Sequence, residues 1–443
     1  MKIVNYLKIN LTIFLFLFFN CIFAEKNINK TFTPVGAEIK ESNEGLIPEW
    51  NKYINNENLV INNNDFSDHF LNDSPIEIID KRNYIDYVKV LPFGLSELVK
   101  KIDDFKISLY PTIRSADYPD ALKQRFKSVN QEFDDTNLRL NNLKVGDLPF
   151  RFPKSGEQII WNHLLRYQGG SIERKFHTFV VNKDGNFSKV GVWVKRVYKT
   201  HMDKKEPNKL FYALGKYFEP ATLVGDILLV HENVDQLKNS RKSWIYNEAQ
   251  KRVRRAPDVG YDAVGSGSQG LITADQVDAY NGAPDRYEWK LLGKKNLIVP
   301  YNCYKFNNKS VPYKSIIKKG SVNFEFMRYE YHRVWVIEAN LKSSSSHIYS
   351  KRVFYVDEDS WSILVDESYS KNGDLWRVAI HGIIQLQEQN FPWYRIHVHH
   401  DLINKKYYVS GLDNEVKKTM KIGFKGKLRQ FQPNALRRMA AGR

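Results

Sequence analysis

Near the C-terminal end of the chain, two histidines separated by one residue have the type and spacing of metal ligands. They lie in the run His397-Val398-His399-His400-Asp401, which has strand character, so His397 and His399 share one face and Asp401 continues it. Neutral imidazoles are common zinc ligands. The local pattern supplies no third ligand. We therefore expect no metal and no cofactor, with His397 and His399 as the residues at which a metal would bind.

Consecutive acids offer a second kind of chemistry. Asp357, Glu358 and Asp359 follow a segment with strand character, and Glu330 and Glu338 lie on one face of another. Two carboxylates on either side of a glycosidic bond can hydrolyse it. Acidic clusters at turns are usually solvated, however, and the sequence contains no Gly-x-Ser-x-Gly, His-Glu-x-x-His or Gly-x-x-x-x-Gly-Lys motif. We expect no catalytic residue in this chain.

Four cations within five residues form a possible anion-binding segment. Lys251, Arg252, Arg254 and Arg255 follow a strand and end at Pro257, with Arg252 and Arg254 on one face. Guanidinium groups bind carboxylates and phosphates with two parallel hydrogen bonds, so these arginines could contact an anionic headgroup or protein partner. They could equally form structural ion pairs. The partners would then be neighbouring acids such as Asp258, Asp262, Asp278 and Asp285 or the cluster Asp357–Asp359.

Aromatic residues in strand patterns are candidates for the wall of an apolar ligand cavity. In the segment 328–341, one face carries Tyr329, Tyr331, Arg333, Trp335 and Ile337. The same face could be ordinary core, and Arg333 would then need a buried carboxylate partner, which Asp357, Glu358 or Asp359 could supply. The full set of cavity candidates is Trp244, Tyr246, Trp289, Tyr329, Tyr331, Trp335 and Ile337.

Alternating apolar and polar residues predict the elements that position these side chains. Strands are expected at 105–110, 176–181, 190–198, 210–218, 226–232, 328–341, 352–356, 361–366, 376–386, 393–400 and 407–412. So many successive strands predict a mainly β (α+β) fold, with one large, strongly curved antiparallel sheet or open barrel covered by a few helices. Helices are expected near 84–90, 95–102 and 120–143. The covering helices are expected at 157–168, which begins with a Ser155/Gln158 capping box, and around 273–281.

The N-terminus has the order of an export signal: Lys2 and Lys8, an apolar run, then Ala24 before charged residues. We expect residues 1–24 to be cleaved after Ala24; lipidation at Cys21 is the alternative, although Phe19 and Asn20 do not fit a lipobox. The net charge is +17, and the leader contributes two lysines, which leaves +15. This excess favours acidic proteins or an anionic membrane surface as partners, and export argues against nucleic acid.

The rest of the chain is expected to form one domain without a disulfide, since Cys303 is then the only cysteine. Residues 25–60 read as an extended N-terminal arm that Trp50 anchors. Residues 61–443 read as a single large β-rich domain, with helical and irregular additions at 61–150 and a basic C-terminal tail at 421–443.

Short motifs along the mature chain resemble a known family. They are TPVGAE (33–38), GLIPEW (45–50), FPKSG (152–156), WNH (161–163), WIY (244–246), RVRRAP (252–257), YD (261–262), NGA (281–283), DRYEWK (285–290), VPYN (299–302), HRVWV (332–336) and FYVDED (354–359). Together they resemble the DUF1329 proteins of Gram-negative bacteria, which are placed with the outer-membrane lipoprotein carriers of LolA/LolB type.

The resemblance implies an open, curved barrel closed by helices around an apolar cavity, a periplasmic location and association with an RND-type exporter. It brings no catalytic residue. The leading hypothesis is a non-catalytic periplasmic carrier or accessory protein for a hydrophobic, lipid-like ligand, soluble rather than attached to the outer membrane. A docking scaffold for an envelope transport complex, with no ligand of its own, is the alternative, and an envelope hydrolase is the third hypothesis.

Overall fold

The computed structural model describes residues 30–50, 70, 72–128, 133–134, 139–140, 148–236, 239–256, 261–265, 267–417 and 420–442. The expected leader and Cys21 lie outside these residues. Among the described residues, no helix has both the length and the apolar character needed to cross a bilayer.

A single curved sheet dominates the molecule. Its strands follow one another in space as β11 (Tyr287–Pro300), β12 (Tyr329–Leu341), β13 (Lys351–Asp357), β14 (Ile363–Tyr369), β15 (Leu375–Leu386), β16 (Phe391–Asp401), β17 (Lys406–Leu412), β5 (Ser171–Val181), β6 (Phe187–Tyr198), β7 (Lys209–Glu219), β8 (Ile227–Asn233), β9 (Lys242–Asn247) and β10 (Arg252–Ala256). Neighbours along this path are antiparallel, and the sheet does not close, because β10 pairs with β9 alone among the described strands. The expected mainly β, curved antiparallel architecture is confirmed.

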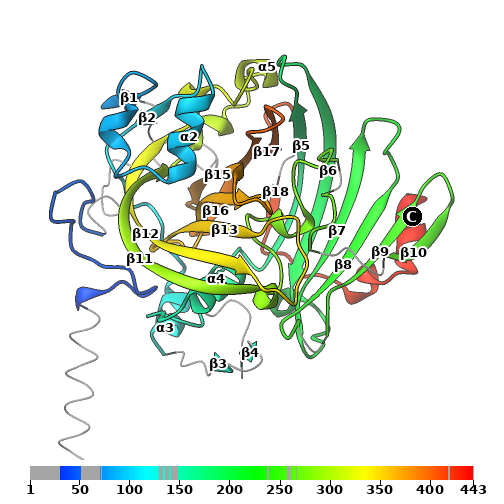
Figure 1. Ribbon diagram of the computed structural model, residues 1–443. Coiled ribbons are helices and arrows are strands. Elements are labelled where there is room, and N and C mark those ends of the chain that lie inside the picture. The colour runs from blue at the N-terminus through cyan, green and yellow to red at the C-terminus, as the bar shows by residue number, and fades with distance from the viewer. Residues whose placement is uncertain are drawn as a thin grey trace, which may run out of the picture.

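Short strands extend the sheet at two places. β2 (Ile107–Leu109) joins β12 in parallel and carries β1 (Glu77–Ile79) on its other side, while β18 (Met420–Ile422) pairs with β5. A separate hairpin consists of β3 (Phe133–Asp134) and β4 (Arg139–Leu140). In Figure 1, β11 and β12 bend through an arc at one side of the molecule, and β7 to β10 fan out at the other.

A bulge helps β11 to follow this arc. The pairing of β11 with β12 shifts register between Leu291 and Gly293, and Gly293 has φ +110°, a conformation that glycine adopts without steric cost. The sequence analysis missed β11, because Gly293 and the neighbouring Lys294, Lys295 and Asn296 interrupt its alternation.

Helices and loops cover both faces of the sheet. The longer helices are α2 (Phe93–Lys101), α3 (Asp120–Ser128) and α4 (Gly156–Leu165); α5 (Tyr313–Ile316) and α6 (Ala435–Ala440) are shorter. Single 3-10 turns are η1 (Tyr84–Tyr87), η2 (Lys199–His201), η3 (Ala274–Gln276), η4 (Pro284–Arg286), η5 (Tyr304–Asn307), η6 (Phe324–Phe326) and η7 (Leu428–Phe431).

The two faces have different coverings. One, here called the α4 face, is covered by α4 and the segment 267–283; Gly156 at the start of α4 lies so close to β11 that an added Cβ would come within 3.0 Å of the Trp289 Cβ. The other, here called the α2 face, is covered by α2 and the segment 301–327. There the Gly94 N–H donates to Glu367 at 2.7 Å.

Three of the expected helices differ in the structure, and the one expected near 84–90 is only the 3-10 turn η1. The predicted 157–168 helix is α4, whose N-cap Ser155 accepts from the Gln158 N–H as the capping box indicated. The expected helix at 273–281 is wrong: only the turn η3 forms, because Asp278 and Ala279 have φ of 64° and 66°, which no right-handed helix accommodates. The predicted helix at 120–143 ends with α3 at Ser128, and Phe133 lies in β3.

The C-terminal basic segment packs against the wing β6 to β10. Phe431 and Leu436 are buried there with Tyr212, Leu229 and Tyr246 in a core separate from the main one. In Figure 1, α6 lies beside the last strands of the sheet.

Candidate functional site

The acids that follow β13 lie at the centre of a buried ionic network. Asp357 is the last residue of β13, Glu358 and Asp359 begin the turn to β14, and at most 2% of each residue is exposed. A run of acids at a turn is usually exposed to solvent, but these three acids are buried. Buried carboxylates need cations or hydrogen-bond donors, and the surrounding elements supply both.

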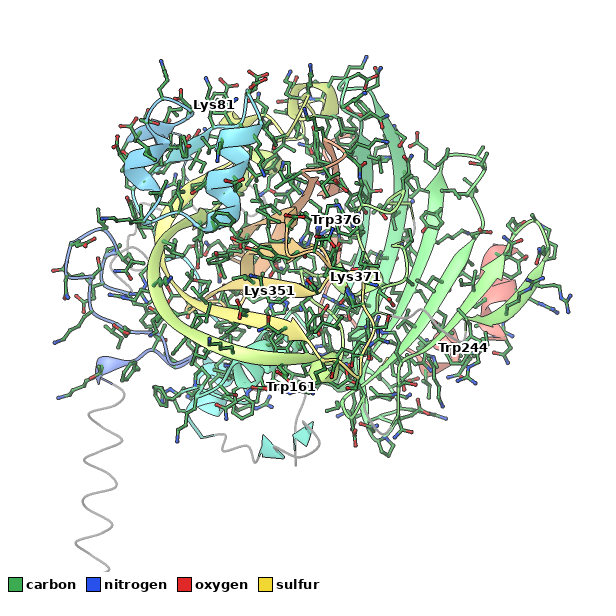
Figure 2. The ribbon with its side chains drawn as sticks, in the orientation of Figure 1. Lys81, Trp161, Trp244, Lys351, Lys371 and Trp376 are labelled. Carbon is green, nitrogen blue, oxygen red and sulfur yellow. The ribbon has the colours of Figure 1, made fainter. Side chains whose placement is uncertain are left out.

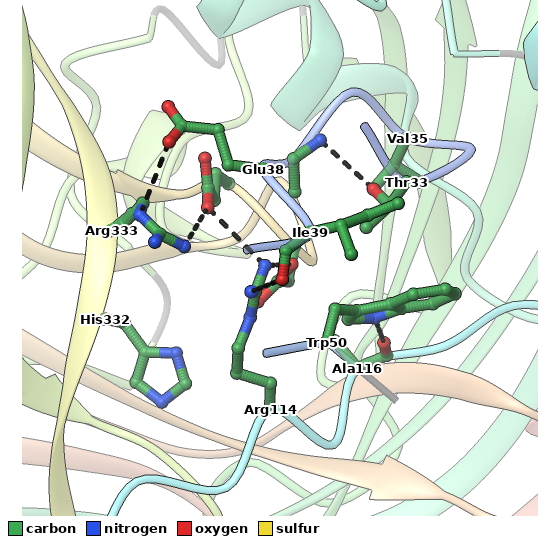
Figure 3. A network of polar contacts seen from close by, with 12 residues as sticks. Thr33, Val35, Glu38, Ile39, Trp50, Arg114, Ala116, His332 and Arg333 are labelled. Carbon is green, nitrogen blue, oxygen red and sulfur yellow. Dashed lines mark hydrogen bonds and ion pairs between the residues drawn. The ribbon is translucent and has the colours of Figure 1, made fainter. Parts of the chain in front are cut away.

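Asp359 is neutralised by an arginine from outside the main sheet path. Arg114, in the segment after β2, donates from Nε and Nη2 to the two Asp359 oxygens at 2.8 and 2.7 Å. The other nitrogen, Nη1, donates to the carbonyl oxygens of Ile39 and Pro48 at 3.4 and 3.3 Å. One guanidinium therefore ties the turn to residues 39 and 48 of the N-terminal arm (Figure 3).

Glu358 is surrounded by cations. Lys294 of β11 donates to it at 2.8 Å and to Glu38 of the arm at 2.9 Å. Arg333 of β12 lies 3.5 Å from Glu358 and donates from Nη2 to the Lys40 carbonyl oxygen at 2.7 Å. The pairing of Arg333 with the Asp357–Asp359 cluster, one of the two possibilities open from the sequence, is thus present for Glu358.

Asp357 has no cation of its own. One carboxylate oxygen accepts from the Tyr301 hydroxyl at 3.1 Å and from the Ser360 hydroxyl at 2.6 Å, while the other has no hydrogen-bond partner. The nearest imidazole nitrogen, Nδ1 of His332, is 3.9 Å away. Burial, with Asp359 nearby, raises the pKa of Asp357 to about 6.

The charges of the network are not balanced. It contains four carboxylates, those of Glu38, Asp357, Glu358 and Asp359, and the cations of Arg114, Lys294 and Arg333. This excess of one acid gives the physical reason for the raised pKa of Asp357 and for that of Glu358, which burial raises to about 7: one proton shared between the two carboxyls neutralises the set.

The N-terminal arm, residues 30–50, lies over this network without joining the sheet; its bridge between Phe32 and Glu38 is internal. It is bound by side chains of the body: besides the contacts of Arg114 and Arg333, the Trp361 indole donates to the Val35 carbonyl oxygen at 3.2 Å. The arm buries the apolar side chains of Val35, Ala37 and Ile47 in the main core. Trp50 donates to the Ala116 carbonyl oxygen at 3.5 Å, as its predicted anchoring role requires (Figure 3).

The same turn does not have the chemistry of a metal site. Ligand atoms of His332, Asp357 and Asp359 lie within 4.8 Å of one another. Both oxygens of Asp359 already accept from Arg114, however, and His332 Nε2 lies 3.1 Å from Glu330, which pairs with Arg328. A cation at this position would have to displace the guanidinium group, so we assign the acids to an ionic network.

The cavity candidates fall into two groups. On β12 and its neighbours, Trp335 is half-buried and stacks on Trp361, and Lys294 lies over its ring. Tyr329, Tyr331, Ile337 and Trp289 belong to the main core. Trp244 and Tyr246 are elsewhere: they pack under α6 in the separate wing core, and Figure 2 shows Trp244 on that wing.

The basic cluster lies at the open edge of the sheet. Arg252, Arg254 and Arg255 are exposed on β10, and none has an ion pair among the described residues. Two of the acids expected to pair with them have other partners: Asp278 pairs with Arg166 at 2.8 Å and Asp262 with Arg286 at 3.6 Å, while Asp258 lies outside the described residues. The cluster is therefore separate from the buried network.

The remaining members of the network were not predictable from the sequence. Glu38, Lys294 and Arg114 carry no signal beyond membership of short motifs or polar runs, and the register of β11 on β12 is what brings Lys294 to Glu358. His381, which lies on β15 opposite His397, was likewise not predictable from the sequence.

Fold and site together define a class of protein: an open, curved antiparallel sheet covered on both faces, with an N-terminal arm tied to a buried ionic network. The chain matches the model of the family described as "Protein of unknown function (DUF1329)" over residues 78–437. It is 36% identical over 418 residues to a Pseudomonas aeruginosa protein described as "Uncharacterized protein PA3922", a match that covers 93% of this chain and 92% of that one. The chain belongs to the DUF1329 family, and the resemblance seen in its motifs is confirmed.

Three of the solved structures with some similarity to this chain are bacterial proteins. An outer membrane lipoprotein-sorting protein domain from Vibrio parahaemolyticus has a TM-score of 0.45 and 15% identity, and the match covers 63% of this chain and 97% of that one. A DUF1329 family protein from Desulfovibrio piger has a TM-score of 0.42 and 15% identity, over 61% and 92% of the two chains. A LolA superfamily protein from Nitrosomonas europaea has a TM-score of 0.38 and 13% identity, over 63% and 98%.

Proposed function

We propose that this protein is a non-catalytic periplasmic carrier or accessory protein for a hydrophobic, lipid-like ligand, and that the N-terminal arm is the removable cover of its binding surface. The observation that carries the proposal is the way in which the arm is bound. Its carbonyl oxygens accept from body side chains, its apolar residues fill the core beside Trp361, and it pairs with no strand of the sheet.

The free energy of burying an acyl chain is large enough for a lipid to replace the apolar contacts of the arm. Burying a Val or Ile side chain is worth about 1.5–3 kcal/mol, so Val35, Ala37 and Ile47 together contribute about 4–6 kcal/mol. An acyl chain that buries about fourteen CH₂ groups gains about 11 kcal/mol, at about 0.8 kcal/mol each. A ligand of this size could therefore displace the apolar part of the arm and occupy the surface beneath it.

Trp335 is the aromatic side chain best placed to contact such a ligand. It is half-buried, stacks on Trp361 and lies beside Lys294, whose ammonium group is 4.7 Å from the centre of its ring. In the proposed bound state, the Trp335–Trp361 pair contacts the acyl chain of the ligand. Lys294 and Arg333 then bind an anionic headgroup in place of Glu38. Tyr331, which is 9% exposed, would extend the wall.

A fluorescent fatty acid titrated into the purified protein tests this proposal. In Ile47→Asp the arm loses a large apolar side chain that is 1% exposed, and we expect tighter probe binding than in the wild type. Ile403→Asp, at a residue that is 62% exposed, is the matched control and should leave binding unchanged. Trp335→Ala should weaken binding in both backgrounds. Circular dichroism and the melting temperature check that each variant is folded. A protein that binds no probe with the arm displaced would refute the carrier function.

A second candidate function, a docking scaffold for an envelope transport complex such as an RND-type exporter, is favoured by the exposed arginines of β10. Arg252, Arg254 and Arg255 lie on an edge strand, where an acidic partner segment could also pair with the backbone. Their surroundings leave them free of ion pairs within the described residues.

Pull-down from envelope extracts separates the two functions. Reversing the three arginines to glutamate should abolish capture of a docking partner, and raising the salt concentration should weaken capture by the wild type. Fatty-acid binding should be unaffected by this variant. If the same partners are captured by the reversed variant, β10 is not the docking surface.

A further inference from the structure

Three imidazole groups meet on the α4 face of the sheet, away from the network under the arm. His381 on β15 lies directly opposite His397 on β16, and His399 follows on the same face of β16. One ligand nitrogen from each of the three lies within 4.8 Å of the other two. The histidine pair noted in the sequence thus gains the third ligand that its local pattern lacked, from a neighbouring strand.

The hydrogen bonds around the cluster fix the orientation of its central ring. His381 Nε2 is 2.9 Å from a carboxylate oxygen of Asp366, and His381 Nδ1 is 2.8 Å from His397 Nδ1. An Nε2–H that donates to Asp366 leaves the lone pair of Nδ1 directed at the cluster. A histidine whose second nitrogen donates to a carboxylate is the usual arrangement of a metal ligand, because the carboxylate holds the ring and increases its basicity.

His399 supplies a buried nitrogen with no partner. The residue is 3% exposed, and its Nδ1 has no hydrogen bond. His163 differs, because both its nitrogens have partners, the Trp361 and Asp278 carbonyl oxygens, each 3.1 Å away; His400 on the other face also has a buried Nδ1 without a partner. What distinguishes His399 is that its ring contacts two further imidazoles, those of His381 and His397, so its costly unpartnered nitrogen lies beside other metal-ligand nitrogens.

Burial keeps the imidazoles neutral, and three of the four arginines that face the cluster have an acidic partner. Burial holds the pKa of His381 at about 3 and the pKa values of His397 and His399 well below their usual range. The nearby arginines have acidic partners: Arg352 pairs with Asp275 at 3.1 Å, Arg377 lies 3.4 Å from Asp401, and Arg166 is 2.8 Å from Asp278. Arg174 is the fourth cation that faces the cluster, and it donates to the Gly411 carbonyl oxygen at 3.1 Å; the acid in contact with the imidazoles is Asp366.

We propose that His381, His397 and His399 bind one divalent transition-metal ion of the Zn²⁺ type, with Asp366 as the carboxylate that orients His381. Three neutral imidazoles suit Zn²⁺, Cu²⁺ or Ni²⁺. A zinc–nitrogen bond is about 2.0–2.1 Å long. Mg²⁺ and Ca²⁺ are disfavoured, because they require oxygen ligands. Small rotations of the rings would bring the nitrogens from within 4.8 Å to tetrahedral spacing. His397 is half-buried, so the fourth position can accept water or an anionic group.

The site goes beyond the proposed carrier function and does not depend on it. It lies on β15 and β16, whereas the surface under the arm is formed by β11, β12 and the turn after β13. Loss of fatty-acid binding in an arm or Trp335 variant would leave metal binding intact, and the converse should also hold.

Metal titration of protein prepared without a polyhistidine tag tests the site. After removal of metal with EDTA, Zn²⁺ is titrated in competition with a chromophoric chelator, and Co²⁺ is added separately to record its visible absorption. We expect one Zn²⁺ per chain and the intense absorption of tetrahedral Co²⁺. His397→Gln and His399→Gln should each weaken Zn²⁺ binding by more than about 100-fold, and Asp366→Asn by about 10–100-fold.

His400→Gln is the matched control. His400 lies on the same strand, is equally buried, and faces the α2 face, where its Nε2 is 2.9 Å from the Ser321 hydroxyl. Its substitution should leave the Zn²⁺ affinity unchanged. Stoichiometric binding that survives in both ligand variants, or that is lost equally in His400→Gln, would overturn the assignment. If the ligand variants fail to fold, the wild-type titration decides: no Zn²⁺ at one equivalent and no tetrahedral Co²⁺ spectrum would overturn it.

Discussion

Replacing Asp357 with asparagine should stabilise the protein, but only where the carboxyl would be ionised. The folded pKa of about 6 lies above the ordinary value of 3.8. Between these values the folded chain holds a proton that the unfolded chain has lost, so this group's contribution to stability is full below pH 3.8 and disappears as pH rises through about 6. At about 1.4 kcal/mol per pKa unit, the difference corresponds to about 3 kcal/mol.

Asparagine cannot ionise, and its carbonyl oxygen can still accept from the Tyr301 and Ser360 hydroxyls, while its amide can donate toward His332. Urea unfolding followed by tryptophan fluorescence gives the free energy at pH 4, 6 and 8. We expect Asp357→Asn to equal the wild type at pH 4 and to exceed it by about 2–3 kcal/mol at pH 8. Asp374→Asn, at an exposed position, is the control.

Titrating groups outside the network are common to both proteins and cancel in the difference, whereas Glu358 shares the proton with Asp357, so the difference reports the titration of the pair. A variant that is less stable than the wild type at pH 8, or a difference that does not change between pH 4 and pH 8, would refute the charge imbalance of the network.

Arg114→Ala should lower the free energy of unfolding by about 3–5 kcal/mol, because it leaves Asp359 buried without its bidentate partner; Arg82→Ala, whose side chain is 87% exposed, should change it by less than about 0.5 kcal/mol in the same urea assay. Equal effects would argue against the network. Gly382→Ala should cost about 1–3 kcal/mol, because the new Cβ would lie 2.8 Å from Cys303 Sγ and 2.9 Å from Ile396 Cγ2. Gly215→Ala, where the nearest atom is 3.9 Å away, should be tolerated, and a similar melting temperature for the two variants would contradict the packing at Gly382.

The alternation of apolar and polar residues along single strands predicted most of the strands of the fold. The segment 328–341 was predicted as one strand with Tyr329, Tyr331, Arg333, Trp335 and Ile337 on a common face, and β12 has these bounds to within a residue. The Ser155/Gln158 capping box placed α4 correctly, because it is a contact between residues three positions apart. For these two elements, local patterns were sufficient.

Contacts between segments that are far apart in the sequence could not be predicted from local patterns. Arg114 and Asp359 are 245 residues apart, and Lys294 and Glu38 are 256 apart, so their pairing depends on the register of β11 and the path of the arm. His381 could have been found only with the pairing of β15 and β16, since nothing in its own neighbourhood marks it as a ligand. The helix expected at 273–281 failed because positive φ at Asp278 and Ala279 leaves no trace in the apolar pattern.

The central claim, that the protein carries a lipid-like ligand beneath its N-terminal arm, is tested most directly by native mass spectrometry of protein exported and purified from its own cells, followed by lipid extraction. We expect one bound lipid molecule per protein chain, and a smaller fraction of lipid-bound protein for Trp335→Ala. Repeated isolation of the wild-type chain at its bare mass, with no lipid in the extract, would contradict it.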